Sequence, residues 1–428
     1  MRRKLRGSLL ISVLLTLTLC AGNTTVLAAG EGGETLTLMC VATEADPYYQ
    51  AYKDIAARFS ENNEYGVTIE VEAYENEQHK TKLTTLMASD AAPDIFYTYE
   101  LAFLEPFVNG GKVIDITSYL DNDPDWKASF AEGTLDVLSY DGKNYGIPTE
   151  SVLGVMFYNK QIFEENGVEV PKTYDEFLTL CQTLKDNGVI PMTLSGTDAW
   201  IPAQFVQQIS AGMSGDEMFR AICDGTEVWN NEINVKAAEE VFKMAEAGYF
   251  QDGFLGMVPE ESTALFTSGK AAMYYQGTWD TGLVQECEIG DVAGAFIMPA
   301  YDPQYSNYAV GSVDGSFALS NNCKNVDAAM AFLKFWSSTE IEEMLLYDYA
   351  KAPSTNNVVI DETKLSPVMK EVVECGSSVA GLMPWWDRQF GAGEGVEFNN
   401  TCVAILGGED AQTAFDELQQ FAEDYRDR

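Results

Sequence analysis

The chain has 428 residues, of which 46% are apolar and 12% aromatic, and its formal net charge is −40 at pH 7. This length and composition are typical of a globular protein with room for two sizeable lobes, and they exclude a disordered chain. The strong negative charge argues against binding to nucleic acid and against adsorption of the folded surface to anionic lipid headgroups.

Residues 1–29 have the pattern of an export signal. A basic start precedes the apolar stretch 9–19, which is too short to span a membrane stably, and 26–28 (Val-Leu-Ala) offer a cleavage site. Cys20 directly follows the apolar stretch, as in a lipoprotein signal, although Leu19 replaces the small residue that normally precedes such a cysteine. Signal cleavage and lipidation of Cys20 both stay open. No later segment is apolar enough to span a bilayer, so we expect the protein outside the cell, free or lipid-tethered.

The first part of the mature chain alternates between strand and helix patterns. Strands are predicted at 36–40, 67–71 and 93–97, with helices over 47–59 and 80–89. This β-α-β-α-β order predicts a parallel sheet covered by helices, in which ligands lie beyond the carboxyl ends of the strands. The residues expected there are Glu44, Asp46, Tyr97, Tyr99 and Glu100.

Residues 145–177 predict a buried strand that passes from one lobe into the next. Val152 to Phe157 is an apolar β-branched and aromatic run, a helix over 160–166 ends at Gly167, and Thr173 with Glu176 has capping-box spacing. Glu150 stands between two extended apolar segments. It is expected either to face a cleft at a lobe junction or to lie at a solvated strand end.

The rest of the chain continues the same alternation. A strand over 189–194 precedes helices over 202–223 and 235–247, and 266–280 predict a helix end, a turn and another strand. Residues 310–320 form a glycine-interrupted strand, and the next helix carries Trp336 in its apolar stripe, so Trp336 is predicted to be core. Thr339 and Glu342 predict a second capping box, and an amphipathic helix after Asp410 closes the chain.

Metal and cofactor motifs are not predicted. Acidic residues at 121, 123, 125 and 132 fit part of a calcium loop, but Trp126 occupies the position that requires glycine, which favours a solvated turn capping a short helix. Gly269-Lys270 lacks the first glycine of a phosphate loop. The seven cysteines after Cys20 have no CxxC pair and are interpreted mostly as small buried hydrophobes, with a bridge such as Cys223–Cys287 left open.

Aromatic residues and acids gather at predicted strand ends and loops, and this mixture suits sugars. Pyranose C–H faces pack on aromatic rings, while hydroxyl groups pair with carboxylates and guanidinium groups. The single histidine, His79, is expected to face solvent, which argues against a histidine-dependent triad. A glycoside hydrolase with paired carboxylates and a surface adhesion module stay as alternatives. The candidates after residue 149 are Glu150, Trp200, Trp279, Asp280, Asp314, Trp385, Trp386 and Arg388.

An ordered set of short motifs resembles family 1 of the extracellular solute-binding proteins. The set comprises 93–96 (Pro-Asp-Ile-Phe), the stretch 145–177, 266–280, Lys324-Asn325 and Ala352-Pro353. The resemblance implies a two-lobed, periplasmic-binding-protein-like α/β fold of type II, each lobe with a mainly parallel sheet flanked by helices. It implies lobes of 34–149 plus 308–352 and of 150–307 plus 353–428, with crossings near 148–152, 306–311 and 350–355.

The same resemblance implies a function. A carbohydrate is trapped between the lobes and passed to the membrane permease of an importer driven by ATP, without turnover. It implies no cofactor, and we expect a monomer. The position of Glu150 is similar to that of the family's hinge carboxylate, and Trp200, Trp279 and Trp385 or Trp386 are similar to its stacking aromatics.

Overall fold

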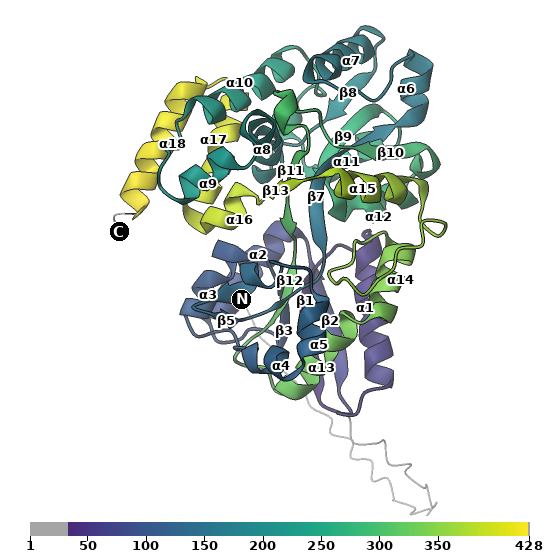
Figure 1. The fold of residues 1–428 in the computed structure, drawn as a ribbon, viewed down its shortest axis with the longest axis vertical. Coiled ribbons are helices and arrows are strands. Elements are labelled where there is room, and N and C mark those ends of the chain that lie inside the picture. Colours follow the sequence, from purple (N-terminus) through teal and green to yellow (C-terminus); the bar gives the residue numbers. More distant parts are fainter. Residues whose placement is uncertain (1–32, 427–428) are drawn as a thin grey trace, which may run out of the picture.

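A computed structural model describes residues 33–426, so the predicted export signal and Cys20 lie outside the described residues. Two β-sheets, each flanked by helices, form two lobes that lie one above the other in Figure 1, with the crossing segments between them. The two-lobed α/β prediction is confirmed. Within residues 33–426, no helix has the length and apolarity that crossing a bilayer requires.

The first lobe is built on a five-stranded sheet of order β2-β1-β3-β12-β6. Strands β1, β2 and β3 are parallel, as the β-α-β-α-β pattern predicts, whereas β12 runs antiparallel to β3 and β6. The strands are β1 (Thr35–Val41), β2 (Thr68–Tyr74), β3 (Ile95–Thr98), β6 (Ile147–Pro148) and β12 (Ser316–Leu319). A separate hairpin joins β4 (Ser139–Tyr140) to β5 (Lys143–Asn144).

Helices cover this first sheet and bury an aromatic core against it. Trp336 is 1% exposed and stacks on Tyr52, with ring centroids 5.3 Å apart, so its predicted place in the core is confirmed. The helices are α1 (Pro47–Glu61), α2 (Asn76–Ala88), α3 (Glu105–Asn109), α4 (Thr117–Asn122), α5 (Pro124–Ser129), α13 (Val326–Trp336) and α14 (Thr339–Tyr349).

The second lobe has a mixed sheet of order β13-β11-β7-β9-β8, with β10 also paired to β7. The central strand β7 is antiparallel to β9, β10 and β11, so the prediction of a mainly parallel sheet is wrong for this lobe. Its strands are β7 (Ser151–Asn159), β8 (Ile190–Thr193), β9 (Ala271–Gly277), β10 (Ala293–Phe296), β11 (Tyr308–Val313) and β13 (Gly381–Met383).

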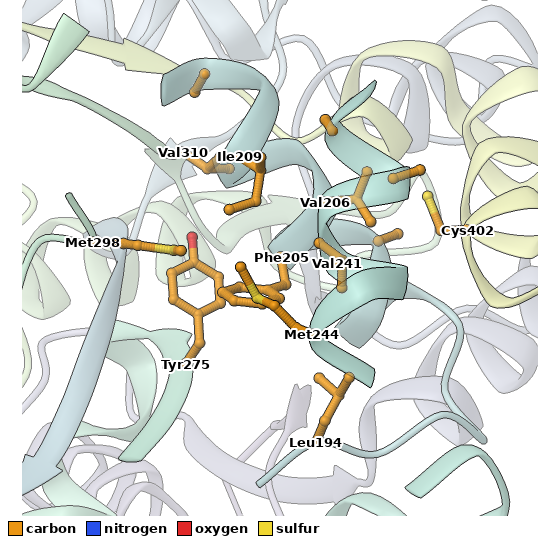
Figure 2. Close-up of a cluster of buried hydrophobic side chains, with 14 of the residues drawn as sticks. Leu194, Phe205, Val206, Ile209, Val241, Met244, Tyr275, Met298, Val310 and Cys402 are labelled. Carbon is orange, nitrogen blue, oxygen red and sulfur yellow. The ribbon is translucent and has the colours of Figure 1, made fainter. Parts of the chain in front are cut away.

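A nearly fully buried helix, α8, organises the core of the second lobe. Its residues Phe205, Val206 and Ile209 pack among Val241, Met244, Tyr275 and Cys402 from other elements (Figure 2). The helices of this lobe are α6 (Lys160–Asn166), α7 (Tyr174–Asp186), α8 (Trp200–Ser214), α9 (Glu217–Cys223), α10 (Glu232–Glu246), α11 (Pro259–Thr267), α12 (Thr281–Glu286), α15 (Pro367–Ser378), α16 (Trp386–Phe390), α17 (Val396–Leu406) and α18 (Ala411–Arg426).

Three segments connect the two sheets. The first joins β6 to β7 at Thr149 and Glu150, and the second joins β11 to β12 at Asp314 and Gly315. The third follows α14 at residues 350–355. Residues 308–313 were expected in the first lobe with a crossing at 306–311, but their strand β11 pairs with β7 in the second sheet. The crossing comes later because the apolar run 310–320 is two strands separated by Gly315, at φ 78°.

Two local predictions are wrong for reasons visible in the packing. His79 is 1% exposed and its Nε2 lies 2.8 Å from the Tyr97 carbonyl oxygen, because it sits one helical turn before Leu83 on the inward face of α2. Thr339 is not the cap of α14, whose N-cap is Ser338. Glu342 instead accepts hydrogen bonds from Ser354 N (3.0 Å) and Oγ (2.6 Å), which fixes the third crossing to α14.

Other local predictions hold. Gly167 ends α6 at φ 64°, and the Thr173 hydroxyl accepts a hydrogen bond from Glu176 N at 3.2 Å. In the acidic turn, Asp123 accepts from Trp126 N and thereby caps α5, as the turn interpretation predicts. The cysteines within the described residues are all free, including Cys223 and Cys287, for which a bridge was left open.

Candidate ligand-binding cleft

A cavity of about 600 Å³ lies between the lobes and takes its lining from both. The first lobe contributes the loop after β1, the start of α2 and the end of β3. The second lobe contributes the start of α8, the turn after β9 and the segment around α16. The crossings contribute Glu150, Asp314 and Lys351. The cavity therefore lies where a change in the angle between the lobes would alter its size.

Three tryptophans of the second lobe form a continuous aromatic wall. Trp200 begins α8, Trp279 follows β9, and Trp385 precedes α16. The ring centroids of Trp279 lie 5.9 Å from Trp200 and 5.5 Å from Trp385. A Cβ on Gly277 would lie 2.3 Å from the Trp279 ring, so the end of β9 must be glycine for this indole to lie where it does.

Trp386 was expected to contact ligand, but the structure places it in the core. It is 1% exposed, does not line the cavity, and packs on Trp229 with centroids 4.8 Å apart. Of the adjacent Trp385-Trp386 pair, only Trp385 lines the cavity, since the start of α16 turns the second indole toward α17.

The first lobe faces this wall with Tyr97 and Tyr99, which line the cavity in an edge-to-face pair with centroids 5.4 Å apart. The Tyr99 hydroxyl donates to Asn76 Oδ1 at the start of α2. Two aromatic surfaces, one from each lobe, therefore bound the same space.

A buried ion pair joins the first and third crossings. Lys351 Nζ lies 2.6 Å from Glu150 Oε1, and both side chains are nearly fully buried. Lys351 Nζ also lies 4.7 Å from the Tyr48 ring centroid. Burial raises the pKa of Glu150 to about 7, with Asp314 adding to the rise and Lys351 opposing it. Of the two expected positions for Glu150, the structure shows the lobe junction.

A second buried ion pair joins the middle crossing to α16. Arg388 Nη2 donates to Asp314 Oδ1 at 3.0 Å, and the guanidinium carbon lies 3.4 Å from the Tyr99 ring centroid. Arg388 therefore links the second lobe to the first through both charge and stacking. Its Nε and Nη1 have no protein partner among the described residues.

Two further acids line the cavity at the other end. Asp280 accepts from the Tyr274 hydroxyl at 2.7 Å, and burial, with Asp46 adding, raises the pKa of Asp280 to about 7. Asp46 caps α1 by accepting from Tyr48 N at 3.0 Å, and burial raises its pKa above the ordinary value.

Glu44 and Glu100 do not line the cavity. Glu44 is exposed in the loop after β1. Glu100 is 0% exposed, and neither of its carboxyl oxygens has a partner in the described chain; burial raises its pKa to about 7, with Arg388 opposing. The cavity thus brings together Asp46, Tyr97, Tyr99, Glu150, Trp200, Trp279, Asp280, Asp314, Trp385 and Arg388.

Sequence reasoning missed several polar residues of the cavity. Gln204 and Gln207 are 2% and 1% exposed on the buried helix α8. Three glutamines, Gln208 included, in so apolar a helix were the signal that could have revealed them. Lys351 could have been found as the basic residue of the expected third crossing. Other missed polar residues include Thr43, Glu75, Asn76, Lys80, Glu260, Thr263, Thr267, Tyr274, Gln276, Glu286, Asp387 and Asn399.

Two α/β lobes around a cleft at three crossings define a class of proteins that bind a solute between their lobes. The model of the family of bacterial extracellular solute-binding proteins matches residues 42–343, and the chain belongs to this family. It is therefore a binding protein of the kind that serves ABC transporters, and not an enzyme. The glycoside hydrolase alternative is overturned, and the family implies a periplasmic or extracellular location.

Named relatives agree with this assignment. The chain is 26% identical over 411 residues to the diacetylchitobiose binding protein DasA of Streptomyces coelicolor, covering 90% of each chain. It superposes on a chitin oligosaccharide binding protein with a TM-score of 0.84 at 22% identity, covering 92% of this chain and 99% of the other. A protein studied for xylan utilization by Caldanaerobius polysaccharolyticus gives a TM-score of 0.83 at 28% identity, with 90% and 99% covered.

Proposed function

We propose that this protein captures a short oligosaccharide between its lobes and delivers it to the membrane permease of an ABC importer. The observation that carries the proposal is the aromatic wall of Trp200, Trp279 and Trp385, in a cavity to which the other lobe contributes Tyr97 and Tyr99, the latter covered by Arg388. Indole and phenol rings pack on the C–H faces of pyranose rings and leave the ring hydroxyls directed to the sides.

Polar groups around the aromatic surfaces suit those hydroxyls. Gln204, Asp280 and Arg388 line the same cavity and supply amide, carboxylate and guanidinium groups. The volume of about 600 Å³ lies within the range of about 300–1,000 Å³ typical of small-molecule sites. Relatives named for binding diacetylchitobiose and arabinooligosaccharides support an oligosaccharide rather than a monosaccharide.

The proposed mechanism is closure of the lobes on the ligand. A saccharide that contacts both lobes binds the closed state more tightly than the open one, so it shifts the population toward closure by that difference in affinity. The permease recognises the closed form and opens it to release the sugar.

Titration calorimetry with matched mono- and oligosaccharides of xylose, arabinose, N-acetylglucosamine and glucose tests the proposal. We expect micromolar or tighter binding of one oligosaccharide series, with its monosaccharide weaker, and recovery of the sugar intact. Failure of every saccharide to bind the folded protein would refute the proposal.

We also propose that the protein acts as a monomer on the outer side of the membrane, after removal of the export signal or lipidation of Cys20. Intact-mass analysis of the native protein distinguishes a diacylglyceryl-modified Cys20 from an N-terminus near residue 29. Light scattering during size-exclusion chromatography tests the monomer, since a dimer would double the mass.

A further inference from the structure

The charged side chains that line the cleft are mostly acidic. Among residues 33–426, eight carboxylate side chains line it, against three cationic ones. The acids are Asp46, Glu75, Glu150, Glu260, Asp280, Glu286, Asp314 and Asp387, and the cations are Lys80, Lys351 and Arg388. At pH 8, above the pKa of about 7 of Glu150 and Asp280, an incoming ligand therefore meets an excess of negative charge.

Each of the three cations is already paired within the protein. Lys351 lies 2.6 Å from Glu150, and Arg388 donates to Asp314 at 3.0 Å. Lys80 Nζ lies 2.7 Å from Glu77 Oε1, and Glu77 does not line the cleft. No cation lining the cleft is therefore left to neutralise an acidic ligand without breaking an ion pair.

The donors of Arg388 that lack a protein partner do not change this balance. Its Nε and Nη1 are free to donate, but Asp314, Asp387 and Glu100 all act on the guanidinium charge. Guanidinium donors bind a carboxylate more strongly than a neutral hydroxyl, but an anion here would enter beside the same three acids, which already offset the guanidinium charge.

At the opposite end, neither Asp46 nor Asp280 forms an ion pair among the described residues, although the charge of Lys351 acts on Asp46. Asp280 accepts a hydrogen bond from the Tyr274 hydroxyl, and Asp46 accepts one from a backbone amide. The negative charge of Asp46 also helps to raise the pKa of Asp280. Glu286 has the same effect on Asp46. Partial burial makes the repulsion of a further negative charge stronger than it would be in water.

We propose that the cleft selects uncharged oligosaccharides and rejects saccharides that carry a carboxylate, such as uronic acids. This inference rests on the proposed function, because it concerns the substrate class of the same site. Stacking on the tryptophans contributes affinity for many sugars. The excess of acids repels a ligand carboxylate, and this repulsion distinguishes neutral from acidic saccharides.

The test compares one oligosaccharide with its own oxidised form. If the neutral oligosaccharide that binds most tightly is built of hexoses, its terminal C6 hydroxyl is oxidised to the uronate, which preserves ring stereochemistry and length. If it is built of pentoses, which have no C6 hydroxyl, the comparison uses an oligosaccharide of the same length whose terminal residue is replaced by a uronic acid. At pH 8 we expect the uronate to bind at least about tenfold more weakly in titration calorimetry. Equal or tighter binding of the uronate would overturn the inference and leave the oligosaccharide function intact, whereas failure of both forms to bind would refute the function itself.

Charge-removing variants test whether the acids cause the discrimination. Asp280→Asn keeps an oxygen that can accept from Tyr274, and Asp46→Asn keeps one that can cap α1. Each should narrow the ratio of the two dissociation constants by about threefold or more, whatever it does to the neutral affinity. Asp125→Asn is the matched control, because Asp125 is exposed on α5 outside the cleft and should leave the ratio unchanged. An unchanged ratio in both cleft variants would contradict the inference.

Discussion

The positive charge of Lys351 stabilises the charged form of Glu150 between the lobes. The pair is buried with 2.6 Å between its charged atoms, so removing one partner leaves a charge without water or counterion. Such a pair contributes little net stability when intact but is costly to break.

Lys351→Met should therefore destabilise the folded protein by about 3–5 kcal/mol at pH 8. Loss of the cation should raise the pKa of Glu150 in the folded state beyond about 7. A carboxyl group whose pKa is raised on folding stabilises the fold at pH values below its unfolded pKa, and this stabilisation is lost as the pH rises through its folded pKa. The cost should accordingly shrink as the pH falls from 8 to 5 in urea denaturation. The double variant Glu150→Gln/Lys351→Met should recover much of the loss at pH 8, and a cost independent of pH would contradict this account.

Substitution of Trp279 should affect ligand binding, whereas substitution of Trp386 should affect the stability of the fold. Trp279→Ala should weaken oligosaccharide affinity by about 1–3 kcal/mol with little change in the unliganded melting temperature, because its ring is partly exposed to the cleft.

Trp386→Ala is the matched comparison. It should cost about 3–5 kcal/mol of stability, since the side chain is 1% exposed in the core. Calorimetry measures the oligosaccharide affinity of both variants, and thermal denaturation measures their stability. A large stability loss in Trp279→Ala would assign Trp279 to the core instead.

At the residue scale, the sequence predicted which kinds of side chain form the site, aromatic and acidic. It predicted only for some of them that the side chain points into the cleft. Aromatic and acidic residues after strand ends pointed to the cleft, whereas Trp385 and Trp386 are neighbours whose directions depend on how α16 packs. Glu100 follows β3 as expected, but its side chain is buried and does not line the cavity.

At the scale of elements, the cap of α7 connects a sequence motif to stability. The Thr173 hydroxyl accepts from Glu176 N, and the Glu176 carboxylate accepts from Lys172 N at 2.7 Å. The first bond satisfies an amide that the first turn of a helix leaves free, and the second ties the residue before the cap to that turn.

Thr173→Ala should therefore lower the unfolding free energy by about 0.5–2 kcal/mol. Thr179→Ala, an exposed change in the middle of α7, is the control and should be nearly neutral, because alanine is the better helix former there. Equal losses in the two variants would show that the hydroxyl at position 173 has no capping role.

Elements with local signals were predictable, and pairings between distant strands were not. Helices α6 and α7 follow from caps and a left-handed glycine within a few residues. The split of 310–320 into β11 and β12 depends on partners far along the chain, β7 and β3. The antiparallel neighbours of β7 have the same cause, since periodicity indicates a strand but not its partner.

At the scale of the whole molecule, a ligand that bridges the lobes should stabilise the entire fold. At a free concentration of 100 times the dissociation constant, we expect the unfolding free energy to rise by about 2.7 kcal/mol. Urea denaturation with and without the oligosaccharide measures this gain. The uronate, at the same concentration, is the control and should give a smaller gain. A ligand that binds by calorimetry without shifting the transition would contradict binding to the folded state alone.

The position of β12 has a consequence for how the polypeptide acquires its structure. This strand lies between β3 and β6, so residues 316–319 complete a sheet whose other strands lie between residues 35 and 148. A chain delivered amino-terminus first presents β3 with an unpaired edge until Ser316 arrives, and such an edge invites aggregation. Fragments that end before residue 316 should therefore fail to form a stable first lobe, and productive folding must wait until most of the chain has emerged.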